Sequence, residues 1–309
     1  MSVTDATPGA TGARWWPSPF GANDQLGMLN HVTDAKRLAA LASVREGRLY
    51  DLGRVLDEQV PVFPGRYFRQ TLVTTAHHAN AATAAEDERP TGVGDNNVNW
   101  VTEIVTGTTQ LGTHLDALSH LQIGDRGYNG WRVAELAETW GTSRLGIETV
   151  PQIVTRGLLV DVPAVRGVDR LEIGDVIGVD DAERALHGIE PEPGDAVLFH
   201  TGWGAHWSDA DTYLSGEPGP GLELGSWLVD HGVALTGCDT WSYGPVPAED
   251  LSRPFEVPQT LNVRHGVFIV ENLDTAALAA DGVREFALVL THPKLRGATG
   301  AWTSPIALV

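Results

Sequence analysis

Short apolar runs bounded by Gly, Pro and Asp recur along the second half of the chain. Five of them are rich in β-branched and aromatic residues, a composition that predicts buried strands, at 156–162, 195–203, 232–239, 266–273 and 285–290. Ala- and Leu-rich segments with helical spacing lie at 133–140, 179–188, 222–232 and 273–282, some with a final glycine suited to ending a helix. The alternation of the two patterns predicts a layered α/β domain.

The chain is expected to form one domain. Its 309 residues exceed the usual domain size, but α/β folds often reach this length as one unit, and 42% hydrophobic residues suffice for a sizeable core. We expect residues 1–18 to form a flexible leader and residues 19–309 the domain. The polar, aperiodic stretch 79–99 predicts a long loop, which is either a lid or a surface excursion.

Charge and composition exclude several classes of protein. The net charge is −19, from 21 Lys and Arg against 40 Asp and Glu, so a nucleic acid would be repelled. No stretch approaches the roughly 18 apolar residues of a membrane span, and the start lacks the basic and apolar regions of a secretory signal. A single cysteine forms no internal disulfide. We therefore expect a soluble, cytoplasmic protein that has no nucleic-acid or membrane partner.

The densest group of chemically capable side chains lies in TTQLGTHLDALSHL, at 108–121. In an extended segment Gln110, His114 and Asp116 would share one face, and Gly112 would leave space there for an ion, a water or a substrate. Imidazole and carboxylate are good ligands for a divalent cation, and the unligated His120 could transfer a proton. A hydrogen-bonded core pair would give the same pattern, so spacing alone leaves both interpretations open.

The motif resembles the signature H-x-G-T-H-x-D-x-P-x-H of the cyclase superfamily, which includes kynurenine formamidase and isatin hydrolase. Further blocks are similar to longer bacterial members and lie at 19–30, 50–65, 156–162, 195–207, 237–242, 264–274 and 294–300. The resemblance implies a swivelling β/β/α domain that assembles as a homodimer or homotetramer. It also implies hydrolysis of amide or related bonds with one or two divalent ions, commonly zinc or manganese.

The same resemblance implies a role for individual residues. His114 and Asp116 stand where the family has metal ligands, and His120 where it has the catalytic acid/base. Glu271, in IVENLD, stands where the family has a further metal-site carboxylate, and we group it with His120 as catalytic. Phe63, in PVFPG, stands where the family has an aromatic substrate contact.

Several of the ten tryptophans lie near loops or block ends, where they could contact an aromatic substrate; they are Trp15, Trp16, Trp100, Trp203 and Trp241. Most are expected to pack in the core or in a subunit interface. Trp203 is the one that we select, with Phe63, as a substrate contact.

Two positions depart from the family's pattern. The first histidine of the signature is Gln110 here, whose amide oxygen suits manganese or magnesium better than zinc. The histidine that usually precedes the R-H-G block is replaced by Pro258, which has no ligating side chain. We therefore expect one weakly held ion at His114 and Asp116, helped by Gln110 and Glu271. A zinc site completed by other groups and a site without metal are the alternatives.

Four other residues have chemically capable side chains. We interpret His77 and His78 as surface or loop residues, because neighbours on a strand point to opposite faces. Cys238 follows an apolar strand and has no basic neighbour, so we expect a small buried residue rather than a nucleophile. Asp239 follows the same predicted strand, a position that favours a functional carboxylate.

Three functions remain compatible with the sequence. The leading hypothesis is a metal-dependent hydrolase of a small cyclic or N-acyl amide, or of a lactone, with His120 as the acid/base. The second is an aromatic polyketide-type cyclase or an isomerase that uses the same pocket with weak or no metal. The third is a non-catalytic binding homologue, because a fold alone does not guarantee chemistry. No serine-hydrolase elbow, phosphate loop or dinucleotide fingerprint is present.

Overall fold

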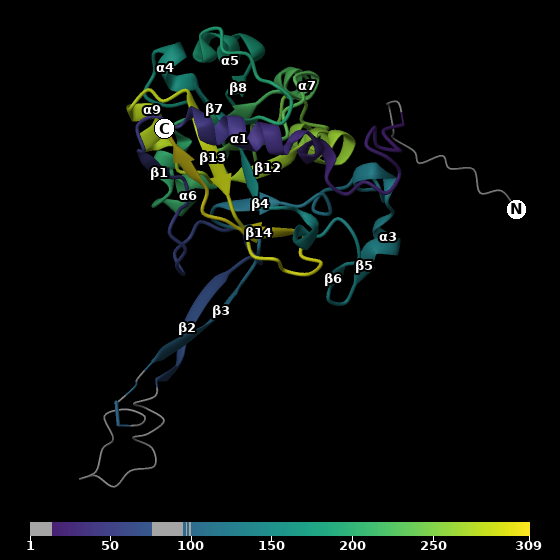
Figure 1. The fold of residues 1–309 in the computed structure, drawn as a ribbon, viewed down its shortest axis with the longest axis vertical. Helices are drawn as coiled ribbons and strands as arrows, with labels where there is room; N and C mark the ends of the chain where they lie inside the picture. The colour runs from purple at the N-terminus through teal and green to yellow at the C-terminus, as the bar shows by residue number, and fades with distance from the viewer. Residues whose placement is uncertain (1–13, 76–94, 97, 99) are drawn as a thin grey trace, which may run out of the picture.

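A large mixed sheet forms the centre of the protein (Figure 1). The structure is a computed structural model that describes residues 14–75, 95, 96, 98 and 100–309. Within these residues nine strands form the sheet in the order β1-β15-β13-β7-β9-β11-β12-β4-β14. Their bounds are β1 (Leu49–Asp51), β4 (His114–Asp116), β7 (Ile153–Asp161), β9 (Ala196–His200), β11 (Leu235–Cys238), β12 (Phe268–Glu271), β13 (Glu285–Leu290), β14 (Gly300–Trp302) and β15 (Ile306–Leu308). The predicted α/β class is confirmed.

The middle of the sheet is parallel and its flanks are antiparallel. Strands β7, β9, β11 and β12 run parallel to one another, and their neighbours β13 and β4 run antiparallel to them. Each of the five predicted strand segments overlaps one of these strands, and β7 begins three residues before its predicted segment. Their apolar runs are nearly continuous because both faces of the sheet are covered: Leu158 and Val160 enter one core, and Leu159 enters the other.

Helices are short, and most flank the parallel strands. The α-helices are α1 (Asp34–Ser43), α3 (Val133–Leu136), α4 (Val162–Arg166), α5 (Val179–Leu186), α6 (Ala210–Tyr213), α7 (Leu222–Asp230), α8 (Glu256–Gln259) and α9 (Ala276–Ala280). Single turns of 3-10 helix are η1 (Gly27–His31), η2 (Tyr128–Gly130), η3 (Ile147–Thr149) and η4 (Trp203–His206), and η5 (Thr260–His265) is a π-helix. Three predicted helices correspond to α5, α7 and α9.

The helix predicted at 133–140 is wrong beyond its first turn. Only α3 is helical, and the chain then forms a two-stranded hairpin of β5 (Ala137–Glu138) and β6 (Gly141–Thr142). Gly141, at φ +139°, packs against the backbone of Gly297. This tertiary contact requires a turn at a position where the local pattern favours a helix.

Two apolar cores lie on the two faces of the sheet. The first contains residues of β4, β12, β13 and α9, among them Leu115, Val270, Phe286 and Leu278. The second lies beneath α5 and α7 and contains Val197, Phe199, Ile269, Leu186 and Leu228. Strands β8 (Val176–Ile177) and β10 (Gly219–Pro220) form a separate parallel pair on the connections. A helix long and apolar enough to cross a bilayer is absent from the described part of the chain.

A two-stranded ribbon projects from the body of the protein (Figure 1). It consists of β2 (Phe68–Thr75) and β3 (Val101–Gly107), paired antiparallel, and the first six residues of β3 are exposed. These strands were not predicted, because without a buried face their side chains lack the alternation that identifies a strand. The loop predicted at 79–99 lies between them and falls almost entirely outside the described residues.

The ordered packing begins before residue 19. Ser18, which we assigned to the leader, is buried, and its backbone N–H donates to the side chain of Asn129 at 2.7 Å. Its hydroxyl lies 2.6 Å from that of Tyr128. The domain therefore includes at least the last residue of the predicted leader.

A close backbone contact connects η1 to the segment that leads into β12. Gly27 and Gly266 have φ values of +52° and +67°, and a Cβ added at Gly266 would meet Cα of Gly27 at 2.7 Å. The backbone N–H of Met28 donates to the carbonyl of Gly266 at 2.9 Å. The contact therefore fixes the chain just before the start of β12, the strand whose last residue is Glu271.

We predict that Gly27→Ala destabilises the protein by at least about 3 kcal/mol, because a Cβ at residue 27 would overlap the backbone of Gly266. Gly47→Ala is the matched control: Gly47 also has a positive φ, +70°, but nothing lies within 4 Å of an added Cβ. The control should lose only about 1 kcal/mol, the conformational cost of an L-residue there. Urea unfolding measures both, and equal losses would contradict the packing argument.

Candidate metal centre

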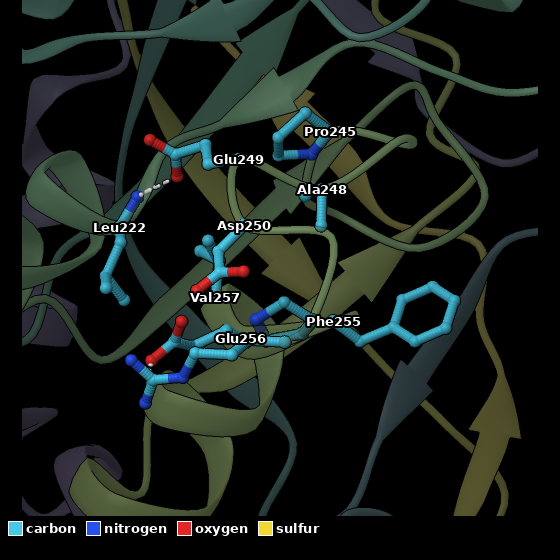
Figure 2. Close-up of a pocket in the computed structure, with 11 residues that line it drawn as sticks. Leu222, Pro245, Ala248, Glu249, Asp250, Phe255, Glu256 and Val257 are labelled. Carbon is cyan, nitrogen blue, oxygen red and sulfur yellow. Dashed lines mark hydrogen bonds and ion pairs between the residues drawn. The ribbon is translucent and has the colours of Figure 1, made fainter.

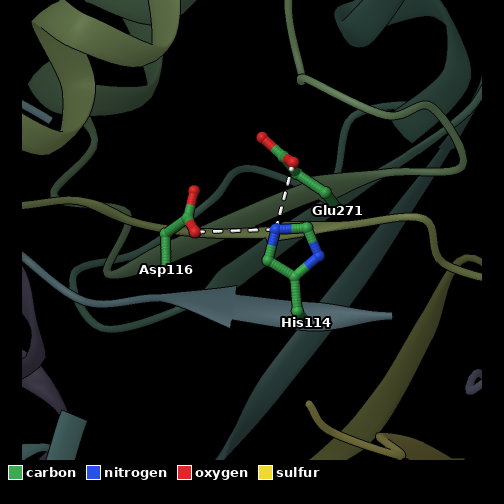
Figure 3. Close-up of side chains that lie close together, drawn as sticks. All are labelled: His114, Asp116 and Glu271. Carbon is green, nitrogen blue, oxygen red and sulfur yellow. Dashed lines mark ion pairs between the residues drawn. The ribbon is translucent and has the colours of Figure 1, made fainter. Parts of the chain in front are cut away.

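Three polar side chains from two neighbouring strands converge on one face of the sheet. β4 lies between β12 and β14, and its register sets Glu271 opposite His114 and Ile269 opposite Asp116. Side chains two apart on a strand share a face, so His114 and Asp116 point the same way while Leu115 enters the first core. Figure 3 shows the imidazole directed between the two carboxylates. The predicted shared face of His114 and Asp116 is confirmed.

The facing atoms of these side chains are close together and buried. Nε2 of His114 lies 3.6 Å from Oδ1 of Asp116 and 3.2 Å from Oε2 of Glu271. Within the described residues, Nε2 and Oδ1 have no hydrogen-bond partner. One ligand atom from each of the three residues lies within 4.8 Å of the other two. This spacing suits coordination of a single ion.

The other ring nitrogen of His114 determines the tautomer. Nδ1 lies 2.8 Å from the carbonyl oxygen of Gly112, and a carbonyl only accepts, so Nδ1 carries the hydrogen. The neutral ring then presents the lone pair of Nε2 to the carboxylates of Asp116 and Glu271. A lone pair facing two carboxylate oxygens is repulsive unless a proton or a cation lies between them. Histidine ligands of metals typically have such a hydrogen bond on their second nitrogen.

Burial disfavours every charge in this cluster. It raises the pKa of Asp116 above its ordinary value, although the nearby His120 lowers it. Burial also raises the pKa of Glu271 to about 7, against the opposing effects of His120 and Arg66, and it lowers the pKa of His114. Adjacent carboxylates that resist ionisation and a neutral imidazole fit a site where a divalent ion supplies the missing positive charge.

The structure does not use the space beside Gly112 as predicted. The side chain of Leu56 occupies the volume that a Cβ at residue 112 would need. Gly112 instead has a φ of +56°, and its carbonyl is the partner of His114. Glycine is required there for the turn and the close packing, and the space for a ligand lies on the other side of the cluster.

Gln110 lies next to the cluster but outside the strand. Its amide oxygen accepts from the hydroxyl of Thr109 at 2.8 Å, and its amide nitrogen donates to that of Thr299 at 3.0 Å. A Cβ at Gly300 would meet this nitrogen at 2.7 Å and Oδ1 of Asp116 at 3.5 Å. The amide is therefore engaged with two threonines, and a role for Gln110 as a ligand stays a prediction.

A cavity of about 290 Å³ opens beside the cluster of His114, Asp116 and Glu271. Asp116, Glu271 and Gln110 form part of its lining, and His120 lies on its wall. The side chain of His120 has no hydrogen-bond partner among the described residues, so it is free to exchange a proton with a molecule in the cavity. Three residues of the sequence motif, Gln110, Asp116 and His120, therefore meet Glu271 at one cavity.

Aromatic rings form another part of the cavity lining. Phe63 and Trp241 pack edge to face with centroids 4.6 Å apart, and Phe255 lies beyond Trp241 at 6.3 Å. The buried carboxyl group of Glu217 accepts from the backbone N–H of Trp241 at 2.7 Å and from the hydroxyl of Ser242 at 2.5 Å. These hydrogen bonds hold the backbone segment that carries Trp241.

Trp203 does not line this cavity. Its ring is 2% exposed, and its indole N–H donates to the carbonyl of Tyr213 at 3.1 Å. The structure therefore brings Phe63, but not Trp203, to the site. Trp203 lies on η4, which follows the buried strand β9, and this position explains why it packs in the interior.

Asp239 and Cys238 stabilise the fold and do not line the cavity. Oδ1 of Asp239 accepts from the N–H and hydroxyl of Thr201, and Oδ2 accepts from the N–H of Gly202 at 3.0 Å, so this carboxylate holds the turn after β9. Cys238 is buried, and burial raises the pKa of its thiol, which fits the expected inert residue. His77 and His78 lie outside the described residues.

Pro258 lies at the boundary between two cavities. It lines the cavity beside His114, Asp116 and Glu271 and also a neighbouring cavity of about 250 Å³, and Phe255 lines both. Figure 2 shows this second cavity, with the Phe255 ring directed away from Glu249 and Asp250. Glu249 accepts from the N–H of Leu222 at the start of α7, so its carboxylate already has a structural role. The residue that replaces the family's histidine thus lies at the site but offers no ligand atom.

Sequence reasoning missed two contributors to the cavity. Arg66 and Phe255 both line it, yet neither lies in a recognised motif. The available signal for Arg66 was local: Pro64 and Gly65 predict a tight turn that brings the residues on either side of it together. Phe255, at φ +56°, has a conformation that no sequence rule for this residue type predicts.

We predict that Glu271→Gln removes a pH dependence of stability from the metal-free protein. The folded protein keeps the proton of Glu271 up to about pH 7, whereas the unfolded chain releases it near 4.5. The free energy of unfolding should therefore fall as the pH rises from 4.5 to 7, by up to about 3 kcal/mol from this group. Glu271→Gln should lack this fall and be the more stable protein above pH 7.

Urea unfolding in chelator, at pH values below and above this range, measures the effect. Glu183→Gln, an exposed position on α5, is the control and should keep the wild-type dependence. If wild type and Glu271→Gln lose the same stability as the pH rises, Glu271 is not the titrating group.

A family model and a solved structure that match this chain are both described as cyclases. The family model described as "Putative cyclase" matches residues 50–245. A crystal structure described as a novel cyclase has a TM-score of 0.81 at 26% identity, over 94% of this chain and 98% of that one. Isatin hydrolase A from Ralstonia solanacearum has a TM-score of 0.62 at 21% identity, over 90% and 97% of the two chains.

A protein from Bacillus stearothermophilus, described as a predicted metal-dependent hydrolase, has a TM-score of 0.53 at 19% identity, over 85% and 98% of the two chains. At these identities the last two structures show a shared fold. No curated protein matches the sequence. Because the family model covers more than half of the chain, the chain belongs to the cyclase family.

Proposed function

We propose that the protein is a metal-dependent hydrolase of a small cyclic or N-acyl amide, or of a lactone. One divalent ion is held by His114, Asp116 and Glu271, and His120 is the acid/base. One nitrogen and two carboxylate ligands suit Mn²⁺ or Zn²⁺. Gln110 lies beside this set, but its amide already bonds two hydroxyl groups, so the proposed site rests on the other three residues.

The observation that supports the ion is the pair of unpartnered buried atoms. Leaving a buried polar atom without a partner costs about 1–3 kcal/mol, and here Nε2 of His114 and Oδ1 of Asp116 both lack one. Both atoms face the same point, close to Oε2 of Glu271. A divalent cation satisfies all three at once and balances the charge of the two carboxylates.

The ion would act as a Lewis acid that polarises the substrate carbonyl and makes water a better nucleophile at neutral pH. His120 would accept a proton from the attacking water and return it to the leaving nitrogen or oxygen. Its place on the cavity wall, without a competing hydrogen bond, supports this role. Phe63 and Trp241 would contact the ring of the substrate and hold its carbonyl toward the cluster.

The size and lining of the cavity support a small substrate. Its volume of about 290 Å³ lies at the lower end of small-molecule pockets. Aromatic side chains line one part of it and the polar cluster lines another, so a compound with a ring and one reactive carbonyl would match both. The similarity in fold to an isatin hydrolase agrees with this class.

We predict that the purified protein binds about one Mn²⁺ or Zn²⁺ per chain, and that His114→Ala and Asp116→Asn weaken binding at least about 100-fold. Removing a residue that only supports a ligand already costs roughly 10- to 100-fold. Calorimetric titration of chelated protein, with elemental analysis, measures this. His120→Ala is the matched control: it removes an imidazole from the same cavity and should leave the affinity for the ion unchanged. A wild-type protein that binds no divalent ion would refute the assignment.

We predict that His120→Ala lowers kcat by about 100- to 10,000-fold, the usual contribution of a general acid/base. The assay is a panel of N-formyl arylamines, cyclic imides and aryl lactones with wild-type protein, and then the variant on the best substrate. Chelator should abolish activity and added Mn²⁺ should restore it. Activity that neither chelator nor added Mn²⁺ changes would contradict metal-dependent hydrolysis.

A second function is favoured by one observation. Burial brings the pKa of Glu271 to about 7, and a carboxyl group with that pKa can donate and accept protons near neutral pH without a metal. Glu271 and His120 could therefore catalyse a cyclisation or an isomerisation. Reaction in ¹⁸O-labelled water separates the two functions, because only hydrolysis incorporates the label into the product.

A further inference from the structure

A tight turn places Arg66 at the cavity beside Phe63. Pro64 and Gly65 occupy the central positions of this turn, Gly65 has a φ of +90°, and the N–H of Arg66 donates to the carbonyl of Phe63 at 3.0 Å. These features are those of a type II turn, in which the first and fourth residues come close together. The turn thereby brings both an aromatic residue and an arginine to the cavity wall.

The guanidinium group of Arg66 has unused hydrogen-bonding capacity. In the described part of the chain it makes one hydrogen bond, from Nη1 to the carbonyl of Gln110 at 2.9 Å, and no ion pair with a carboxylate. Arginine carries five N–H donors in a fork that matches the two oxygens of a carboxylate. Most of the donors therefore remain free for a molecule in the cavity.

The charge of the cavity supports an anionic occupant. The ionisable side chains in its lining are Asp116, His120, Glu271 and Arg66, and burial raises the pKa of the two carboxyl groups. Under the proposed function a divalent ion neutralises the two carboxylates, and the positive charge of Arg66 is then uncompensated. The chain as a whole has a net charge of −19 and repels anions at long range. Inside the cavity, Arg66 would nevertheless attract a negatively charged ligand.

We propose that Arg66 determines substrate specificity by pairing with a carboxylate carried on the ring of the substrate. The substrate class is then an aromatic or cyclic carboxylate whose reactive carbonyl faces His114, Asp116 and Glu271. Its ring lies against Phe63. The claim that this substrate is hydrolysed rests on the proposed function. Recognition of its carboxylate by Arg66 can be measured without any reaction.

The test uses benzoate and benzamide, two ligands of the same shape that differ in charge. Binding is measured by calorimetry and by tryptophan fluorescence, with Mn²⁺ and in chelator, for wild type, Arg66→Gln, Arg66→Lys and Arg69→Gln. Arg69 is the matched control, because it is an exposed arginine three residues further along, on the ribbon. Wild type should bind benzoate at least about ten-fold more tightly than benzamide, as expected for a charge-assisted pair.

Arg66→Gln should lose about ten-fold or more of the affinity for benzoate and keep that for benzamide within about two-fold. Arg66→Lys should retain part of the preference, because it keeps the charge but not the fork, and Arg69→Gln should behave as wild type. Unchanged benzoate binding in Arg66→Gln would overturn the proposal, and so would equal loss of both ligands, which would indicate a structural role. Mn²⁺ binding in the same titrations is a separate result, so failure of the metal site and failure of the Arg66 pair are distinguishable.

Discussion

The pairing register of one three-residue strand is the constraint on which the site depends. β4 is held on both sides, by β12 and by β14, and this pairing sets His114 opposite Glu271 and Trp302. A shift of one residue would turn Leu115 toward the cavity and bury His114 and Asp116 in the apolar core. Leu115, the core residue between His114 and Asp116, therefore specifies the register, and the packing that stabilises the sheet also positions these two polar side chains.

That register brings three buried ionisable side chains together without a compensating ion pair to a lysine or arginine among the described residues. Two carboxyl groups and an imidazole lie together in a buried environment, and burial opposes the charged form of each, as the raised pKa values of Asp116 and Glu271 indicate. Arg66 and His120 favour the ionised forms of the carboxyl groups, but neither forms an ion pair with them among the described residues. Such a cluster is costly unless it binds a ligand, so its retention in the fold is itself an argument for function.

The sequence predicts the parallel strands of the sheet better than it predicts which residues meet at the candidate site. The parallel strands were predictable because burial on both faces gives them continuous apolar runs, and the pair of His114 and Asp116 followed from their spacing. Glu271 is more than a hundred residues away and no spacing rule connects it to them; its place followed from resemblance, and the strand pairing gives the physical reason. The ribbon and the hairpin after α3 were missed, because tertiary contacts or exposure determine them.

Two buried aspartates show why burial alone does not identify a candidate metal ligand. Asp239 and Asp116 both follow the pattern of a carboxylate at or near a strand end, and they are 1% and 3% exposed. Both oxygens of Asp239 accept hydrogen bonds, from Thr201 and from the N–H of Gly202, so the turn uses its whole capacity. Oδ1 of Asp116 has no partner and faces a histidine nitrogen in the same condition. The unsatisfied pair, which is a property of three-dimensional contacts and not of sequence position, is what distinguishes a binding site from a structural carboxylate.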